Sequence, residues 1–478
     1  MTYKGFIGPA YRSRSIAASG DRLVNLFPEQ IESDNGKNGW VLYGTPGISE
    51  FCDLSSIGHP VRAQWAENGR CFVVVGAYLV EVFTDGTYTS RGSVTNPLPS
   101  QPAQIVANGY QLLVKSGTAG FIFDLNTNTL THLSGWLDGV GASAIAMINN
   151  YFLASKKNSR QVFISSLNDG LVWDALDFFT KEGGGDNIVT IRELNRQLWV
   201  EGSATSEVWY NSGSENIFDY VQGAFIQMGC AAAESLRNVD NSLMWVAQNE
   251  GGAATVVRAD GYTAKRMSNH ALEYAMQSYS TVSDAIGFRY QEQGHEFYNL
   301  SFPTANATWT YDAATQQWHE RSFWDSVHAE ALAQRQRYHC YTFGKHLVGD
   351  YATGQLYEQS MTYLSDDGAE IRRIRQAPVI AAEMQRIGFS QLALDLQQGA
   401  DVPNSPAQGY DPTFILRVSN DGGYTWSSEI EAKAGRLGQY GFRTIWRRLG
   451  SGLSRVFEVS CSEPIPHCWI NAYLEMSK

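Results

Sequence analysis

The stretch with the clearest chemical pattern is SNDGGYTW at residues 419–426, which matches the Asp-box motif S-x-D-x-G-x-T-W in full. The carboxylate of Asp421 can accept hydrogen bonds from backbone N–H groups, Gly423 can adopt a positive φ, and Trp426 can fold back on the sheet. These roles belong to the tip of a β-hairpin. The motif therefore predicts a structural hairpin and not a catalytic centre.

Asp boxes also occur in sialidases, which are propellers that cleave glycans, so a catalytic alternative has to be weighed. Sialidases repeat the box from blade to blade and add an arginine cluster and a tyrosine nucleophile. In this chain the full match occurs once, and residues 168–173 (NDGLVW) give a weaker echo. The single match favours a folding device, and a glycan-binding or sialidase-like propeller is kept as the alternative.

The other residue types that could do chemistry are scattered along the chain. The sequence has no G-x-S-x-G, H-E-x-x-H or P-loop pattern. Its nine histidines and six cysteines lack zinc-type spacing, and the cysteines are expected to be buried thiols. The glycine run at residues 183–185 precedes no helical pattern, so no phosphate cradle is expected there. The sequence thus predicts no catalytic, cofactor-binding or metal site and no enzymatic activity.

Two basic segments stand out in a chain whose net charge is −12. The members of the two segments are Arg372, Arg373 and Arg375, and then Arg443, Trp446, Arg447 and Arg448. Arginine pairs bidentately with carboxylate or phosphate, and tryptophan adds apolar area, so both segments could bind an acidic neighbour. The alternatives are a solvated linker for the first segment and a charge-protected edge strand for the second. The negative balance argues against general DNA binding but is compatible with a wall past which DNA slides.

A repeated pair of turns organises the middle of the chain. The first turn of each unit is expected at residues 68–69, 108–109, 149–150, 195–196, 240–241, 293–294 and 336–337. Asn-Gly and related pairs between apolar runs indicate tight hairpins. A period of about 40–50 residues with four short strands per unit is typical of propeller blades. We therefore predict an all-β chain with a propeller of about seven blades over residues 61–360, and a β-sandwich of many hairpins is the alternative.

The longest repeat unit contains the one helical pattern of the propeller region. Asn269 can cap the start of a helix that runs to about Tyr279, and Glu273 lies in its first turn. The apolar face of this helix comprises Ala271, Leu272, Ala275 and Met276. The extra length of this unit is thus explained by an inserted helix between blades.

Three further regions flank the propeller. Residues 1–60 are expected to form an extended N-terminal arm with few regular elements, and residues 361–377 a junction. Residues 378–478 predict a C-terminal β-sandwich-like domain. Its strand candidates are residues 379–383, 387–396, 413–419, 444–449, 456–461 and 469–474. The sequence predicts neither a secretory signal nor a membrane span.

The order of these features resembles the tail-hub proteins of short-tailed phages (podoviruses), also called packaged-DNA stabilisation proteins or tail accessory factors. The resemblance is carried first by NLFPE at residues 25–29 and TPGI at residues 45–48. A propeller-like middle with the inserted helix follows. The chain then has the Asp421-Gly422 hairpin, WRRLG at residues 446–450 and two closing strands. The similarity spans nearly the whole length, although each motif is short.

This resemblance implies a structural virion protein of the viral tail. Six copies would form a homo-hexamer below the portal and its head-completion adaptor ring, close the DNA exit, stabilise packaged DNA, and hold the tail needle and tailspike or fibre proteins. DNA would pass transiently through an acidic channel during ejection, without cofactors or membrane insertion, and assembly would take place in the host cytoplasm. A host-surface-binding tail protein is a further alternative, although it would more often contain a collagen-like or coiled-coil trimer segment.

Overall fold

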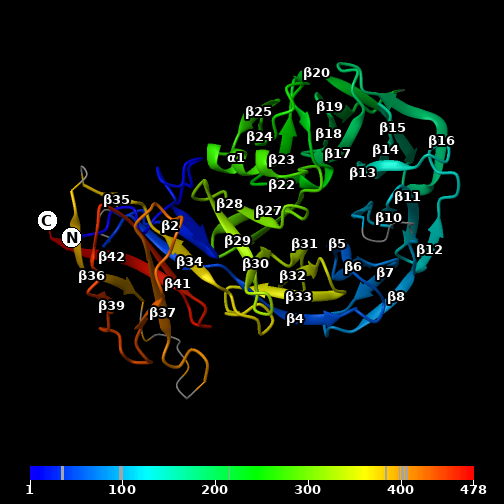
Figure 1. The fold of residues 1–478 in the computed structure, drawn as a ribbon. Coiled ribbons are helices and arrows are strands. Elements are labelled where there is room, and N and C mark those ends of the chain that lie inside the picture. Colours follow the sequence, from blue (N-terminus) through cyan, green and yellow to red (C-terminus); the bar gives the residue numbers. More distant parts are fainter. Residues whose placement is uncertain are drawn as a thin grey trace.

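The structure is a computed structural model that describes residues 1–478 except 34–36, 96–100, 215, 383–384, 398, 400–402, 404–406 and 478. Within the described part, regular structure is almost entirely β, with one α-helix and one short 3₁₀ helix. Figure 1 shows a ring of small sheets and, beside it, a β-sandwich that holds both chain termini. The predicted class, a propeller followed by a β-sandwich, is confirmed. No helix in the described ranges is both long and apolar enough to cross a membrane.

Seven groups of antiparallel strands form the blades of the propeller. Blade 1 comprises β5 (Val61–Glu67), β6 (Arg70–Val75), β7 (Tyr78–Val82) and β8 (Tyr88–Ser93). Blade 2 comprises β9 (Ala103–Ala107), β10 (Gln111–Ser116), β11 (Ala119–Asp124) and β12 (Thr129–His132). Blade 3 comprises β13 (Ala142–Ile148), β14 (Tyr151–Lys156), β15 (Gln161–Ser166) and β16 (Asp169–Thr180). Blade 4 comprises β17 (Ile188–Leu194), β18 (Gln197–Gly202), β19 (Ser206–Asn211) and β20 (Phe218–Ile226).

The last three blades depart from the simple meander. Blade 5 comprises β21 (Gly229–Cys230), the 3₁₀ helix η1 (Ala233–Ser235), β22 (Arg237–Val239), β23 (Ser242–Gln248), β24 (Thr255–Asp260) and β25 (Thr263–Arg266). Blade 6 comprises β26 (Ile286–Glu292), β27 (His295–Phe302), β28 (Ala307–Asp312) and β29 (Gln317–Asp325), with β30 (Glu330–Ala333) paired to β29. Blade 7 comprises β31 (Gln336–Thr342), β32 (Lys345–Asp350), β33 (Gln355–Ser360) and the N-terminal strand β4 (Gly47–Asp53).

Six of the seven expected first turns lie where the sequence places them, between the first two long strands of a blade. In blade 1, Asn68 and Gly69 have φ of 51° and 75°, as a tight hairpin requires. The seventh prediction, at residues 336–337, is wrong because these residues begin β31 and their side chains are buried. The hairpin of blade 7 turns instead at Phe343 and Gly344, with φ of 56° and 74°.

The inserted helix is present as α1 (His270–Ser278). The side chain of Asn269 caps its start by accepting a 2.9 Å hydrogen bond from the backbone N–H of Leu272. Leu272 and Met276 are buried in the core between blades 5 and 6, together with Tyr298. The helix thus fills space between blades, as its apolar face predicts.

The N-terminal region is more regular than the sequence suggests, because residues 1–60 contain four strands and not an arm with few elements. Strand β4 closes the propeller by pairing with β33 in a register from Ser360 opposite Gly47 to Gln355 opposite Asp53. The ring is therefore completed by a segment from far upstream in the sequence.

The other N-terminal strands join the sandwich. One sheet comprises β2 (Leu26–Gln30), β3 (Trp40–Gly44), β42 (Cys468–Ser477), β36 (Ile387–Leu396), β39 (Thr444–Arg447) and β40 (Ser451–Gly452). The other comprises β1 (Arg22–Val24), β34 (Arg373–Gln376), β41 (Ser454–Cys461), β37 (Thr413–Ser419), β38 (Ile430–Lys433) and β35 (Ile380–Ala381). Their shared core combines Phe6, Leu26 and Leu42 from the N-terminal region with Trp446 and Trp469. The sandwich therefore needs both ends of the chain.

Strand β1 also connects the sandwich to the propeller. It pairs in parallel with β29 of blade 6, with Val24 opposite Glu320, and antiparallel with β34. A bidentate ion pair between Arg22 and Glu320, at 2.7–2.8 Å, reinforces this contact. Blade 6 and one sandwich sheet are thus parts of the same hydrogen-bonded sheet. All of β34 lies within the expected junction at residues 361–377.

Candidate functional site

The Asp-box hairpin connects β37 to β38 and folds by satisfying its own polar groups. The Asp421 carboxylate accepts 3.0 Å bonds from the backbone N–H groups of Tyr424 and Thr425, and it accepts the hydroxyl of Ser419 at 2.6 Å. The side-chain bonds from Ser419 and Thr425, followed by the backbone bonds, lower the pKa of Asp421. Gly423 has φ of 105°. This arrangement is that of a hairpin tip, and the box lies in the sandwich, outside the propeller.

The aromatic member of the box packs locally as well. Trp426 is half-buried, and the guanidinium of Arg417 lies 5.4 Å from the centre of its ring. In the weaker echo on blade 3, the indole N–H of Trp173 donates to the carbonyl of Gly170 at 2.7 Å. Both boxes therefore use tryptophan to hold a turn against the strand beside it.

The first basic segment is largely internal, which corrects its expected place on a surface. Arg373 and Arg375 are 1% and 0% exposed in β34, and Arg375 donates to the carbonyls of Phe6 and Gly5, both at 2.5 Å. Arg375 also forms an ion pair with Asp21. The guanidinium of Arg375 is thus bound by the N-terminal region. Of the three arginines only Arg372 is partly exposed, and its guanidinium lies 4.5 Å from the ring centre of Trp324.

The second basic segment divides into a buried and an exposed part. Trp446 is 1% exposed and donates its indole N–H to the carbonyl of Ile430 at 2.9 Å, so it is a core residue of the sandwich. Arg443, Arg447 and Arg448 are exposed, and the described residues contain no ion-pair partner for them. Exposed apolar side chains accompany them in sequence. We call the following set the sandwich rim: Leu437, Tyr440, Phe442, Arg443, Arg447, Arg448 and Leu453.

The axis of the propeller contains a cavity of about 670 Å³ that is lined by residues from all seven blades. Its polar groups pair with one another: Glu234 accepts from Gln104 at 2.8 Å and from Arg237 at 3.0 Å. The imidazoles of His339 and His346 share a hydrogen bond of 3.0 Å. Burial lowers the pKa of His339 to about 3, so this ring is neutral at pH 7. The two histidines lie on β31 and β32, which are neighbouring strands of blade 7.

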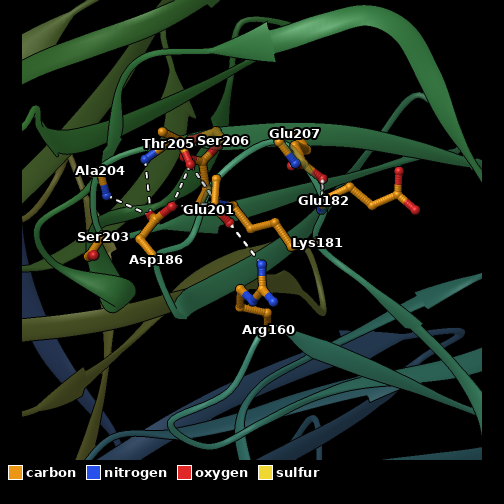
Figure 2. A network of polar contacts seen from close by, with 12 residues as sticks. Arg160, Lys181, Glu182, Asp186, Glu201, Ser203, Ala204, Thr205, Ser206 and Glu207 are labelled. Carbon is orange, nitrogen blue, oxygen red and sulfur yellow. Dashed lines mark hydrogen bonds and ion pairs between the residues drawn. The ribbon is translucent and has the colours of Figure 1, made fainter.

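The glycine run at residues 183–185 does surround an anionic group, but the anion belongs to the protein. The backbone N–H groups of Glu182 and Gly183 donate to the carboxylate of Glu207. Figure 2 shows the neighbouring cluster, in which the ammonium of Lys181 lies 2.6 Å from the carboxylate of Asp186. Lys181 is fully buried. Two backbone donors at the start of this run are thus used by a carboxylate of blade 4.

Beside this cluster, Glu201 is a buried carboxyl with incomplete hydrogen bonding (Figure 2). The hydroxyl of Ser206 donates to one of its oxygens, while the other oxygen has no partner. Burial raises the pKa of Glu201 to about 8, and the bond from Ser206 only partly opposes this effect. The side chain is therefore mostly neutral at pH 7.

We expect Glu201→Gln to stabilise the protein at pH 7.5 but not at pH 4. Between the ordinary carboxyl pKa of 4.5 and the folded pKa of about 8, the unfolded chain releases a proton that the folded chain retains. The free energy of unfolding therefore falls as pH rises through this window, by up to about 1.4 kcal/mol per pH unit. Glutamine cannot titrate, so the variant does not lose this stability as pH rises. At pH 7.5 its free energy of unfolding, measured by urea denaturation, should exceed that of the wild type by a few kcal/mol, which is about the slope multiplied by the width of the window.

The matched control for this substitution is Glu182→Gln, because Glu182 is an exposed carboxylate in the same region (Figure 2). It should change the free energy of unfolding by less than about 0.5 kcal/mol at either pH. A Glu201→Gln variant that is equally destabilised at pH 4 and pH 7.5 would show that the carboxyl is not held neutral by burial.

One exposed group in the described ranges has the composition of a metal site. Ligand atoms of Asp325, His328 and Glu330, at the β29–β30 hairpin, lie within 4.8 Å of one another. His328 already shares a 2.5 Å bond with Asp325. Exposed acidic residues and a histidine pair in this way without an ion, so we assign no metal role to them.

With this geometry in place, the relationship to known proteins can be stated. The sequence matches the family model described as bacteriophage P22 Gp10, beta-propeller, over residues 16–363, and the model described as bacteriophage P22 Gp10, beta-sandwich, over residues 372–477. The chain belongs to the bacteriophage P22 Gp10 family. The resemblance to tail-hub and packaged-DNA stabilisation proteins is thereby confirmed. The protein is a Gp10-type structural protein of the phage tail and, as such, a component of the virion.

Solved structures show more distant similarity to this Gp10-family chain. Virginiamycin B lyase from Staphylococcus aureus is 8% identical, with a TM-score of 0.46, and the match covers 66% of this chain and 99% of the lyase. The designed protein Ika8 is 10% identical, with a TM-score of 0.40 and coverage of 65% and 99%. The Neurospora crassa Pan2 WD40 domain is 8% identical, with a TM-score of 0.41 and coverage of 66% and 94%. No curated protein matches the sequence.

Proposed function

We propose that six copies of this protein form the hub of a short phage tail, in a ring below the portal and the head-completion adaptor. The ring closes the DNA exit, stabilises the packaged DNA, and anchors the tail needle and the tailspike or fibre proteins. The observation that carries this proposal is the match to both Gp10 models, in order, from residue 16 to residue 477. In this role the protein works by shape and contact and catalyses no reaction.

The charge and the thiols of the chain support the proposal. The net charge of −12 suits a ring through which DNA passes during ejection without adhering, since tight binding to the DNA backbone requires a basic surface. All six cysteines are free thiols. Free thiols suit assembly in the reducing cytoplasm of the host, before the protein becomes part of the virion.

Electron microscopy of the purified protein, alone and with the adaptor ring, tests this function. We expect rings of six copies that bind the adaptor. A trimeric spike would instead favour a host-surface-binding tail protein. A monomer that releases sugar from sialylated or polysaccharide substrates, and loses this activity through one point mutation, would favour the glycan-cleaving alternative.

The exposed arginines of the sandwich rim are expected to form one of the ring contacts. We predict that the double substitution Arg447→Ala and Arg448→Ala leaves the thermal transition of the monomer unchanged, because both side chains are exposed. Truncating an interfacial arginine whose partner stays unpaired costs about 2–5 kcal/mol. At about 1.4 kcal/mol per tenfold change, assembly should weaken more than tenfold in sedimentation velocity.

The control for this prediction is Lys4→Ala with Lys265→Ala, which also removes two exposed positive charges but leaves the rim intact. It should assemble like the wild type. If the arginine variant also assembles like the wild type, or if its monomer unfolds at a lower temperature, the rim is not an interface.

A further inference from the structure

The outer strand of blade 3 has an apolar surface that none of the described residues of its own chain covers. Strand β16 forms the free edge of its sheet and is 12 residues long. Figure 1 places it on the outer side of the ring, away from the sandwich. Leu176 is 82% exposed. The other exposed apolar side chains on or next to this strand are Leu167, Leu171, Val172 and Phe178. Several exposed apolar residues along one sheet edge indicate an interaction surface.

A groove lies beside this edge. It has a volume of about 380 Å³ and lies between β16 and residues 131–138, which comprise the end of β12 and the connection that follows it. Its wall includes Leu133, Phe163 and Leu171, and two tryptophans, Trp136 and Trp173, which contact each other edge to face with ring centres 5.6 Å apart. An apolar side chain of a partner would fit a groove of this lining.

Carboxylates surround the apolar residues of this edge. Asp174 and Asp177 flank Leu176 and are exposed, and Glu182 follows the strand. Neither Asp174 nor Asp177 has an ion-pair partner in the described part of the chain. We call Leu171, Val172, Asp174, Leu176, Asp177 and Phe178 of β16, together with the groove, the blade 3 edge. Its apolar residues and its carboxylates together fit a partner surface that is both apolar and basic.

The sandwich rim has this composition. It offers Leu437, Tyr440 and Phe442 as exposed apolar side chains and Arg443, Arg447 and Arg448 as exposed cations without ion partners among the described residues. Tyrosine and arginine are enriched at the centres of protein interfaces. Within one molecule the two surfaces cannot meet, because β16 and β39 lie at opposite ends of the chain's long dimension (Figure 1).

We propose that the blade 3 edge of one copy docks on the sandwich rim of the next copy. Such a contact joins two different surfaces head to tail, and repetition closes into a ring or grows a filament. The proposal rests on the ring of the proposed function and specifies which two surfaces form it. In this contact Asp174 and Asp177 pair with rim arginines, and the rim aromatics and Leu176 exclude water from the pairs.

Charge exchange tests the pairing. The blade variant combines Asp174→Lys and Asp177→Lys, and the rim variant combines Arg447→Glu and Arg448→Glu. Each is expected to assemble at least tenfold more weakly than the wild type in sedimentation velocity, because like charges then face each other. A chain with all four substitutions restores opposite charges and should recover assembly. The control pair Glu250→Lys and Asp260→Lys, at exposed carboxylates of blade 5, should assemble like the wild type.

A second variant separates docking from folding. Leu176→Asp changes a side chain that is 82% exposed, so the monomer should keep its thermal transition while assembly weakens at least tenfold. This variant retains an intact rim, and the rim variant retains an intact blade 3 edge. Mixed together, they can form only one native contact, so we expect dimers and no rings.

The failures of the pairing and of the proposed function can be told apart. If the wild type forms rings and the Leu176→Asp, blade and rim variants do so equally well, the pairing is overturned while the ring stands. If the four-substitution chain stays monomeric as firmly as the rim variant, the pairing is likewise overturned. If the wild type is monomeric at every concentration and with the adaptor present, the proposed ring fails and the pairing fails with it.

Discussion

Arg375→Met is expected to lower the free energy of unfolding by about 3–5 kcal/mol, the usual cost of removing one partner of a buried ion pair. The guanidinium of Arg375 is fully buried and donates at 2.5 Å to the backbone carbonyls of Phe6 and Gly5. It also pairs with Asp21, which is 7% exposed. Methionine fills a similar volume but leaves this carboxylate and both carbonyls without their donor. The loss should be measured by urea denaturation at pH 7.

Arg372→Met provides the matched control, because Arg372 lies three residues earlier and is partly exposed over Trp324. Its effect should stay below about 1 kcal/mol. Asp21→Asn completes a double-mutant cycle, in which the two charges should show a coupling of about 0.5–3 kcal/mol. A loss below about 1 kcal/mol for Arg375→Met would mean that water reaches the site and replaces the arginine, contrary to its burial.

The features that the sequence predicts well are those with local signals. Turn pairs such as Asn68 and Gly69 mark the blades because both residues adopt φ > 0 in tight hairpins. The cap at Asn269 and the apolar spacing of the residues after it identify α1. In the sandwich, the strands expected at residues 387–396 and 413–419 have the same bounds in the structure, and the second is marked by alternation of apolar and polar residues. Each of these patterns is complete within about ten residues, near the length of one element.

The features that the sequence does not reveal depend on contacts between distant segments. Strand β4 pairs with β33, which lies about 300 residues later, and no local pattern reports such a pairing. The burial of Arg375 has the same origin, since its partners Gly5, Phe6 and Asp21 belong to the other end of the chain. An arginine-rich segment is commonly solvated, so its sequence alone favours a surface. The contact between His339 and His346 depends on the hairpin of blade 7, which turns at Phe343 and Gly344 and not at the expected residues 336–337.

The closure of the propeller by β4 leads to the second large prediction. Residues 61–360 alone are expected to lack a cooperative thermal transition, although they contain all other strands of the seven blades. Without β4, strand β33 becomes an exposed edge, and the fully buried side chains of Leu356 and Tyr357 lose cover. The propeller also loses Ile48 and Leu54, which are at most 1% exposed. Each such side chain contributes roughly 1.5–3 kcal/mol, and a domain has only about 5–15 kcal/mol in total.

The same fragment should fold when the β4 segment is attached to its C-terminal end. Gly47 lies opposite Ser360 in the antiparallel register, so residues 47–54 can follow Ser360 through a two-residue Asn-Gly turn. We expect this fragment to unfold cooperatively. A third fragment that has the same extension with Ile48→Asp should lose most of that gain, because the charge would be buried in the blade. Both parent fragments lack β1 and β2, so their difference isolates β4. If residues 61–360 unfold as cooperatively as the extended fragment, or if the extension rescues nothing, the N-terminal strand does not close the ring.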